Sequence, residues 1–320
     1  MKVLRTPDSQ FENLMDYDFP PTYTTIQDVD GTHIRIHSVD VGPKDADPIL
    51  LMHGNPTWSY LYRHMIKALE KTGRRVIALD LVGCGRSDKP AKRKYYTLAR
   101  HHDWYCKWLE ANNHDNITLV CQDWGGPTGL AQAAMMPDRF QHLVIMNTWL
   151  HHSDYEYSEG IRRWNKNWHE GGNFHRPKPD FGLMMLMTAG MIGREDYVKA
   201  SKGEGLPDFS QAALDMYRGF AAPFKDLPDE AFNGARRFPL SIPLDSYHNG
   251  NAAAQELHYK TLLNWDKGAH FIWGCTDDVF VEAWGRNWAD QMNARFDALE
   301  GAGHFLQNTH GKEIVDLIIG

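Results

Sequence analysis

The sequence predicts an α/β fold in which a mostly parallel β-sheet is covered by helices on both faces and carries an inserted helical cap. Short apolar runs alternate with helical patterns over the first half of the chain, as expected for strands joined by crossover helices. Because these runs are nearly continuous, the sheet should be buried on both faces. The alternation stops near residue 149 and strand signals return at 269–278. We therefore assign residues 1–148 and 240–320 to a core domain and residues 149–239 to a cap domain.

The elements of the core are expected in a regular order. Residues 23–41 predict two strands around a turn at Asp30-Gly31. The chain then alternates between strands and helices: a strand at 48–54, a helix at 58–73, a strand at 74–85, a helix at 98–112, a strand at 116–126, a helix at 127–137 and a strand at 140–148. The cap, rich in Trp, Met, Phe and His, predicts several helices. Residues 269–278 and 294–304 then return the chain to the sheet.

Composition narrows the functional classes. The formal net charge of −7 argues against nucleic acid as a partner. The four cysteines show neither metal-ligand spacing nor a disulfide framework, which favours reduced thiols. The first 21 residues lack the apolar region of a signal peptide, and the apolar stretch at 181–193 is too short to span a bilayer. We expect a cytoplasmic, monomeric protein that does not associate with membranes.

Reactive side chains follow four predicted strands, at the edge where open α/β sheets bind ligands. The four loops are 53–56, 122–126, 275–278 and 301–305. In chain order they supply a nucleophile candidate, Asp123, then an acid, Asp277, and then His304, which is the order of the α/β-hydrolase triad. Asp277 is preferred to Asp278 because the first acid after the strand is better placed at this edge.

Asp123 occupies the position that a serine holds in the G-x-S-x-G turn. A serine needs a base to take its proton, whereas a carboxylate is already ionised at neutral pH. A carboxylate can therefore displace a leaving group from an sp³ carbon and leave an alkyl ester on the enzyme. His304, polarised by Asp277, would then activate the water that hydrolyses this ester.

These motifs resemble those of the haloalkane dehalogenases, in particular the subfamily that binds the halide between two tryptophans. The resemblance covers nearly the whole chain and rests on VLRTP at 3–7, HGNPTWSYLYR at 53–63, DLVGCGRSDKP at 80–90, QDWGG at 122–126 and GAGHFLQ at 301–307. It implies the α/β-hydrolase fold, with Asp123 as nucleophile, Asp277 as acid and His304 as base. It also implies hydrolysis of a small apolar haloalkane to alcohol, halide ion and proton, without a metal or organic cofactor.

The resemblance further implies a halide site built from Trp124 and a cap tryptophan. The family pattern G-F-x-x-W matches residues 160–164, so Trp164 is the second indole, although Ile161 replaces the aromatic residue. Trp168, one helical turn later, is the competing candidate. An indole N–H is a donor within a large apolar body, which suits a weakly hydrated anion.

Asn55 and Trp124 are also expected to stabilise negative charge on the ester. Their backbone N–H groups are the candidates for an oxyanion hole when water attacks. The Asn55 side chain is a further candidate donor to the halide, the alternative being that it only shapes the loop.

Other functions remain as alternatives. Epoxide hydrolysis uses the same acid, base and nucleophile but needs a proton donor, usually a cap tyrosine; the cap offers Tyr155, Tyr157, Tyr197 and Tyr217. Trp124 next to the nucleophile favours a leaving anion that needs no proton. A serine esterase is excluded by the motif, and an intact triad argues against a binding protein on a retired hydrolase scaffold. A cofactor-free oxygenase on this scaffold has no supporting feature.

Two further sets of residues in the predicted cap are expected to have mainly structural roles. The methionines of one predicted helix are expected mainly in its core rather than in a substrate pocket: Met184, Met185, Met187 and Met191. The basic pairs Arg162-Arg163 and Arg236-Arg237 are expected on solvated faces or in ion pairs.

Overall fold

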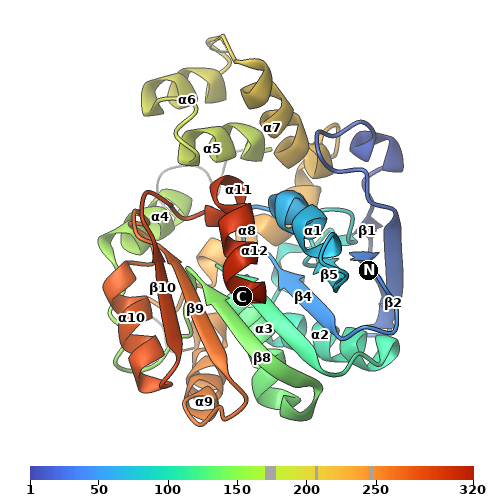
Figure 1. Ribbon diagram of the computed structural model, residues 1–320. Helices are drawn as coiled ribbons and strands as arrows, with labels where there is room; N and C mark the ends of the chain where they lie inside the picture. The colour runs from blue at the N-terminus through green and yellow to red at the C-terminus, as the bar shows by residue number, and fades with distance from the viewer. Residues whose placement is uncertain (170–177, 206–207, 245–247) are drawn as a thin grey trace.

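A computed structural model describes residues 1–169, 178–205, 208–244 and 248–320. Its strands are β1 (Val3–Leu4), β2 (Pro21–Gln27), β3 (His33–Val41), β4 (Pro48–Met52), β5 (Arg75–Leu79), β6 (Lys89–Pro90), β7 (Ile117–Gln122), β8 (Phe140–Met146), β9 (Ala269–Gly274) and β10 (Arg295–Leu299). Eight of them form one sheet in the order β10-β9-β8-β7-β4-β5-β3-β2. Figure 1 shows this twisted sheet running through the molecule.

The sheet is mostly parallel, as predicted. Strands β5, β4, β7, β8, β9 and β10 pair in parallel, whereas β2 and β3 form an antiparallel hairpin, and β3 also pairs antiparallel with β5. Gly31 adopts a positive φ of 83° in the hairpin turn, a conformation that glycine adopts at low cost. A small pairing of β1 with β6 was not predicted, because two-residue strands carry no periodic signal.

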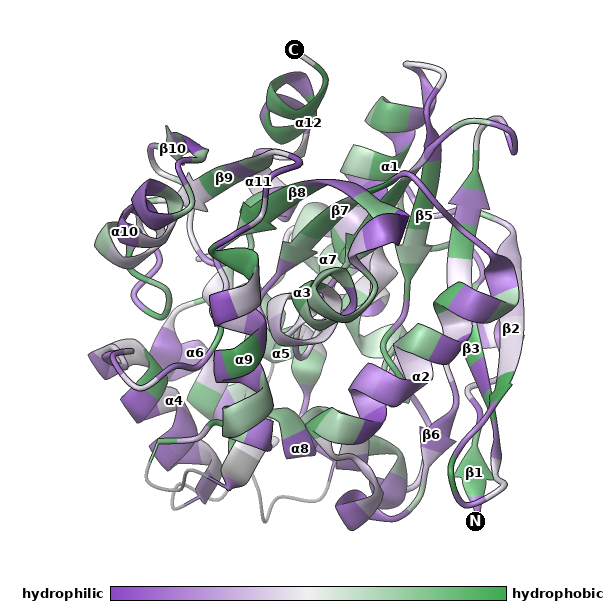
Figure 2. Cartoon of the chain, turned by 90° about the horizontal axis from the view of Figure 1, so that it is seen from below, coloured by the Kyte–Doolittle hydropathy of each residue, from purple (hydrophilic) through white to green (hydrophobic). Residues whose placement is uncertain are grey.

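Helices cover both faces of the sheet. The helices are α1 (Arg63–Glu70), α2 (Leu98–Asn112), α3 (Gly125–Met135), α4 (Glu159–His169), α5 (Phe181–Thr188), α6 (Arg194–Ser201), α7 (Gln211–Ala221), α8 (Asn233–Leu240), α9 (Ala252–Leu262), α10 (Glu282–Gln291), α11 (Leu306–Thr309) and α12 (Gly311–Ile319). Helices α1 and α12 pack together on one face, and α2, α3 and α9 lie on the other (Figures 1 and 2).

Burial of both sheet faces explains the continuous apolar strands. In β7, Leu119 packs into the cluster under α2 and α3, whereas the next residue, Val120, packs into the cluster under α1 and α12. The same alternation places Leu50 and Leu51 of β4 in opposite clusters. Because successive strand residues point to opposite faces, both sets must be apolar. Figure 2 shows β7 and β8 coloured as hydrophobic for much of their length.

Every element described between β8 and β9 is a helix, and loops and turns connect them. Helices α4 to α7 and most of α8 fall within residues 149–239, and α5, α6 and α7 stand at the top of Figure 1. Residues of α4, α5, α8 and the segment 224–232 form a small apolar cluster that includes Trp168, Phe181 and Phe232, whereas α7 packs into the cluster under α1 and α12. Helix α9 returns to the sheet and packs against α3. None of the helices in the described ranges combines the length and apolarity needed to cross a membrane.

Candidate active site

Asp123 lies on the tight turn between β7 and α3. Its φ of 50° is unusual for a residue with a side chain, and its N–H donates to the Asn147 carbonyl over 3.0 Å. A Cβ at Gly125 would collide with the Met52 carbonyl, and one at Gly126 would collide with Thr148. The two glycines are therefore required by the close approach of neighbouring strand ends. The turn holds the Asp123 carboxylate at the carboxyl edge of the sheet.

Two backbone donors hold this carboxylate. The N–H of Asn55 donates to Asp123 Oδ1 over 2.6 Å, and the N–H of Trp124 also bonds the carboxylate. Burial raises the pKa of Asp123 above its usual value, although the charge of His304 and the two N–H groups oppose the shift. The two donors that the sequence suggested for an oxyanion hole thus both face the predicted nucleophile.

His304 lies between the two acids. Its Nδ1 is 2.9 Å from Asp277 Oδ2, and its Nε2 is 3.7 Å from Asp123 Oδ2. Burial lowers the pKa of His304, but the charge and hydrogen bond of Asp277, with a smaller contribution from Asp123, outweigh it and raise the pKa to about 8. A gap of 3.7 Å is too long for a direct hydrogen bond, so Nε2 faces the nucleophile without engaging it. The histidine is therefore placed to act on a molecule bound at Asp123.

Asn147, at the carboxyl end of β8, is a residue that the sequence reasoning missed. Its side-chain Nδ2 donates to Asp277 Oδ2 over 2.9 Å and to the Gly274 carbonyl over 3.1 Å. Its Oδ1 accepts the Gly274 N–H over 2.7 Å. Its position directly after a predicted parallel strand could have indicated a site residue. We did not single it out, because a neutral amide stands out less than an acid or a histidine at that position.

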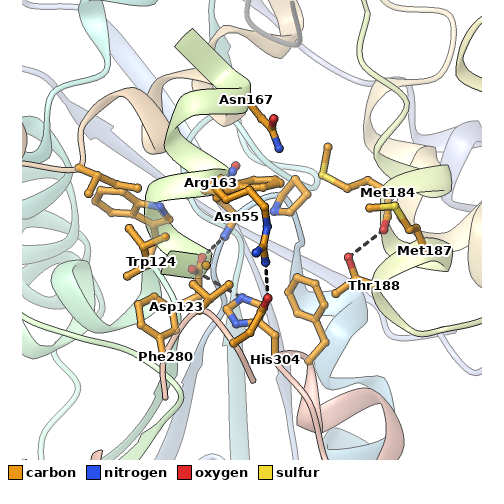
Figure 3. A pocket seen from close by; sticks show the side chains of 18 of the residues that line it. Asn55, Asp123, Trp124, Arg163, Asn167, Met184, Met187, Thr188, Phe280 and His304 are labelled. Carbon is orange, nitrogen blue, oxygen red and sulfur yellow. Dashed lines mark hydrogen bonds and ion pairs between the residues drawn. The ribbon is translucent and has the colours of Figure 1, made fainter. Parts of the chain in front are cut away.

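A cavity of about 470 Å³ opens above these groups. Asp123 and His304 lie at its base in Figure 3, with Trp124, Asn55 and Phe280 beside them. Trp124 is held in place by edge contact with Trp149, at 4.7 Å between ring centroids. Trp149 and Phe280, which stack on each other, were also missed as wall residues.

The competing cap tryptophans occupy different environments. Trp164 lines the cavity and is half-buried, whereas Trp168 is fully buried and packs in the apolar cluster of the cap. Asn55 also lines the cavity, and both polar atoms of its side chain are buried without a hydrogen-bond partner among the described residues. An unpartnered buried amide is costly unless a ligand satisfies it. The side chain therefore has hydrogen-bonding capacity to offer to a bound molecule.

The predictions for the four cap methionines can be compared with the residues that line the cavity. Met185 packs in the core as predicted, whereas Met184 and Met187 line the cavity, and Met191 is exposed. Met184 is also buried in an apolar cluster, so its predicted core position is confirmed, whereas the prediction was wrong for Met187 in the cavity wall and for exposed Met191. One helical turn presents residues to both the core and the cavity.

The four cap tyrosines differ in their access to the cavity. Of these, Tyr197 is in the wall; the hydroxyl of Tyr217 donates instead to Asp180 over 3.0 Å. Tyr155 and Tyr157 are buried and do not line the cavity. In the part of the chain that the structure describes, no three His, Cys, Asp or Glu side chains are grouped to bind a metal ion.

Comparisons with known proteins agree with this architecture. The family model of the α/β hydrolase fold matches residues 47–176. The haloalkane dehalogenase of Psychrobacter cryohalolentis is 39% identical, over 100% of this chain and 97% of that protein. The cis-3-alkyl-4-alkyloxetan-2-one decarboxylase of Shewanella oneidensis is 41% identical, over 88% of this chain and 83% of that protein. The tetrameric haloalkane dehalogenase DpaA of Paraglaciecola agarilytica superposes with a TM-score of 0.83 at 28% identity, covering 99% of this chain and 97% of that one.

Proposed function

The chain belongs to the haloalkane dehalogenase family, and we propose that Asp123, His304 and Asp277 perform its hydrolytic reaction through a covalent ester on Asp123. The reaction converts a haloalkane and water into an alcohol, a halide ion and a proton. The observation that carries the assignment is the alignment of Asp277, His304 and Asp123, the last two of which line one cavity.

In the first step, an oxygen of Asp123 attacks the sp³ carbon that bears the halogen. The new C–O bond forms as the carbon–halogen bond breaks, and the bonding pair leaves with the halide. Because Asn55 and Trp124 hold the carboxylate through backbone N–H groups, little reorganisation is needed before attack. Burial also strips water from the carboxylate, which raises its reactivity toward carbon.

The indole N–H groups of Trp124 and Trp164 are proposed to receive the departing halide. Both side chains line the cavity that contains Asp123, and the unpartnered amide of Asn55 lines it too. Neutral donors in an apolar cavity stabilise the developing charge without holding the product as tightly as an ammonium group would. Trp168 is not proposed as a ligand, because it is fully buried in the cap cluster.

In the second step, His304 takes a proton from water, and the resulting hydroxide attacks the ester carbonyl. The oxyanion so formed is stabilised by the N–H groups of Asn55 and Trp124. Collapse of this intermediate breaks the bond between the carbonyl carbon and the alkoxide oxygen. The alcohol leaves, and Asp123 is regenerated with one oxygen from water. Asp277 orients the imidazole and stabilises its positive charge.

We assign residues 149–239 as the cap domain of this enzyme and residues 1–148 and 240–320 as its core domain. The cavity supports this division, because Asp123, Trp124 and His304 come from the core and Trp164 and Tyr197 from the cap. The apolar cluster formed by α4, α5, α8 and residues 224–232 also supports it. The proposed substrate is a small apolar haloalkane, and the chain is proposed to act as a monomer. Light scattering after size exclusion tests whether the protein is a monomer, since the structure of the similar Paraglaciecola enzyme is tetrameric.

A second candidate substrate is a β-lactone, because the Shewanella relative that is 41% identical is an oxetan-2-one decarboxylase. Such a ring contains an sp³ carbon bonded to the ring oxygen, and Asp123 could attack this carbon in the same geometry. The C–O bond of the ring breaks and leaves a free carboxylate; loss of this group as carbon dioxide then forms the alkene as the new bond to Asp123 breaks. Incubation with a cis-3,4-dialkyl-oxetan-2-one, followed by detection of alkene and carbon dioxide, tests this candidate.

Halide release tests the proposed function. The wild-type enzyme is mixed with 1-bromobutane or 1,2-dibromoethane, and bromide and acid are measured together. Asp123→Asn and Asp123→Ala should abolish release, while Asp138→Asn, an exposed acid on the far side of α3, serves as the matched control. Release that continues in both Asp123 variants would contradict the proposed nucleophile.

A further inference from the structure

Arg163 places a positive charge in the wall of the cavity, which Arg194, Asp278 and several neutral polar side chains also line. It precedes Trp164 on α4, and both side chains line the same space. Figure 3 shows the guanidinium hanging above Asp123 and His304 rather than pointing away from the cavity. A haloalkane has no group that requires this charge, whereas the halide product does.

The partner of Arg163 is Asp278, which directly follows the acid of the triad. The two side chains form an ion pair, yet 54% of the arginine and 67% of the aspartate side-chain surface stay exposed. Exposed pairs of this kind contribute little to stability, because water competes for both charges. The guanidinium can therefore exchange the carboxylate for another anion at little cost.

The backbone beneath this ion pair is fixed. Ser158 Oγ donates to the Val279 carbonyl over 2.6 Å, and a Cβ at Gly160 would collide with the Asp278 carbonyl. The start of α4 is thus seated on the loop that carries Asp278. Side-chain exchange at Arg163 does not require the cap helix to lift from the core.

We propose that Arg163 is an outer halide-binding site, at which the product halide displaces the Asp278 carboxylate on its way from the indole N–H groups to water. The inner site holds the halide with neutral donors only, and the outer site offers the full charge that partly replaces its hydration. Asp278 acts as the competing anion that keeps the outer site from trapping the halide. This inference rests on the proposed function, because that reaction supplies the halide.

The alternative is that the ion pair only fastens the cap to the core. The two explanations predict different signs for the change in bromide affinity. If the pair is only a fastener, removing either charge breaks the same contact and shifts halide binding in the same direction. If Arg163 binds halide, removing Arg163 weakens binding, whereas removing Asp278 frees the guanidinium and strengthens it.

The experiment measures bromide binding to the substrate-free enzyme. Binding is detected by the quenching of tryptophan fluorescence, both at equilibrium and in stopped flow. The wild type is compared with Arg163→Gln, Arg163→Lys, Asp278→Asn and the Arg163→Gln/Asp278→Asn double variant. We expect Arg163→Gln to slow bromide association several-fold and to reduce its dependence on ionic strength, adjusted with sulfate. Arg163→Lys should retain that dependence. Asp278→Asn should bind bromide several-fold more tightly, and the double variant should behave like Arg163→Gln.

Shifts of the same sign in Arg163→Gln and Asp278→Asn, or unchanged kinetics in both, would overturn the inference. Thermal unfolding of each variant shows whether the cap is still folded. Because bromide binding is measured without substrate, it is independent of turnover. A wild-type enzyme that binds bromide but releases none from haloalkanes would refute the proposed function and leave the outer site standing.

Discussion

The side-chain amide of Asn147 donates a hydrogen bond of 2.9 Å to Oδ2 of Asp277, the same oxygen that faces Nδ1 of His304. The backbone carbonyl of Asn147 meanwhile accepts the N–H of Asp123 over 3.0 Å. One residue at the end of β8 thus fixes both the acid that orients the histidine and the turn that carries the nucleophile.

Asn147→Ala should slow hydrolysis of the ester more than its formation. The substitution removes a donor from Asp277 but keeps the backbone contact to Asp123, so the orientation of His304 suffers while the nucleophile stays in place. The expected signature in pre-steady-state experiments with excess substrate is a halide burst with an amplitude near one per enzyme, followed by slow turnover. Asn233→Ala, which removes an amide bonded to the Ala91 carbonyl, is the control. Equal slowing of both steps would argue against this division of roles.

The pKa of His304 predicts how the second step depends on pH. The free enzyme has this pKa raised to about 8, and the negative charge of Asp123 contributes to that shift. Formation of the ester removes the charge on Asp123, so the pKa of His304 falls in the intermediate. Because the neutral imidazole is the base, ester hydrolysis should rise with pH and level off above a pKa that is lower than about 8.

Ester formation should depend on pH in the same direction, but through a different group. It needs ionised Asp123, whose pKa is raised by burial, and so it should decline as the solution becomes acidic, at a pH above the usual range of an aspartate. Stopped-flow measurement of the two steps across pH checks both predictions. A hydrolysis rate that falls as pH rises through neutrality would contradict His304 as the base.

Trp164→Phe should weaken halide binding, whereas Trp168→Phe should not. Loss of one hydrogen bond to a charged partner costs about 1.5–3 kcal/mol, which corresponds to roughly 10-fold to 100-fold in the bromide dissociation constant. Trp168 packs in the cap cluster, so its replacement should lower the free energy of unfolding by about 1 kcal/mol. Both variants are compared with the wild type by bromide titration and chemical denaturation. Weaker bromide binding in Trp168→Phe but not in Trp164→Phe would make Trp168 the second halide-binding indole.

Asn55→Ala should lower the rate of halide release without lowering stability. The backbone N–H that holds Asp123 is kept, while an amide that is buried without a partner in the described structure is removed. Removing an unsatisfied buried polar group relieves its desolvation cost. Denaturation and steady-state kinetics together check this, and a clear loss of stability would show that the amide mainly shapes the loop.

The order of the reactive residues could be predicted because parallel strands bring their carboxyl ends to one edge. Asp123 and Asp277 each follow a strongly apolar strand, and His304 follows the more polar β10, so their proximity required only the topology. Asn147 follows a strongly apolar strand as well, but its contribution lies in contacts across β8 and β9 that have no charge pattern. For the same reason the sequence singled out Asp277 but not its amide partner.

The site residues of the cap were less predictable, because candidate residues of the same type recur at helical spacing. Trp164 and Trp168 lie one turn apart on the same stripe of α4, so periodicity alone could not separate them. The separation depends on how α4 meets α8 and the cap cluster. Arg163 was expected in an ion pair or on a solvated face, and it does pair with Asp278, but its position in the cavity wall is a tertiary property.

The most direct test of the account is detection of the alkyl ester on Asp123. His304→Phe removes the base, so the intermediate should accumulate after mixing with 1-bromobutane, with one bromide released per enzyme. Mass spectrometry of the digested protein should then find a butyl group on the peptide that contains Asp123 and nowhere else. Bromide release without any alkylated peptide, or an adduct on a different residue, would contradict the carboxylate mechanism.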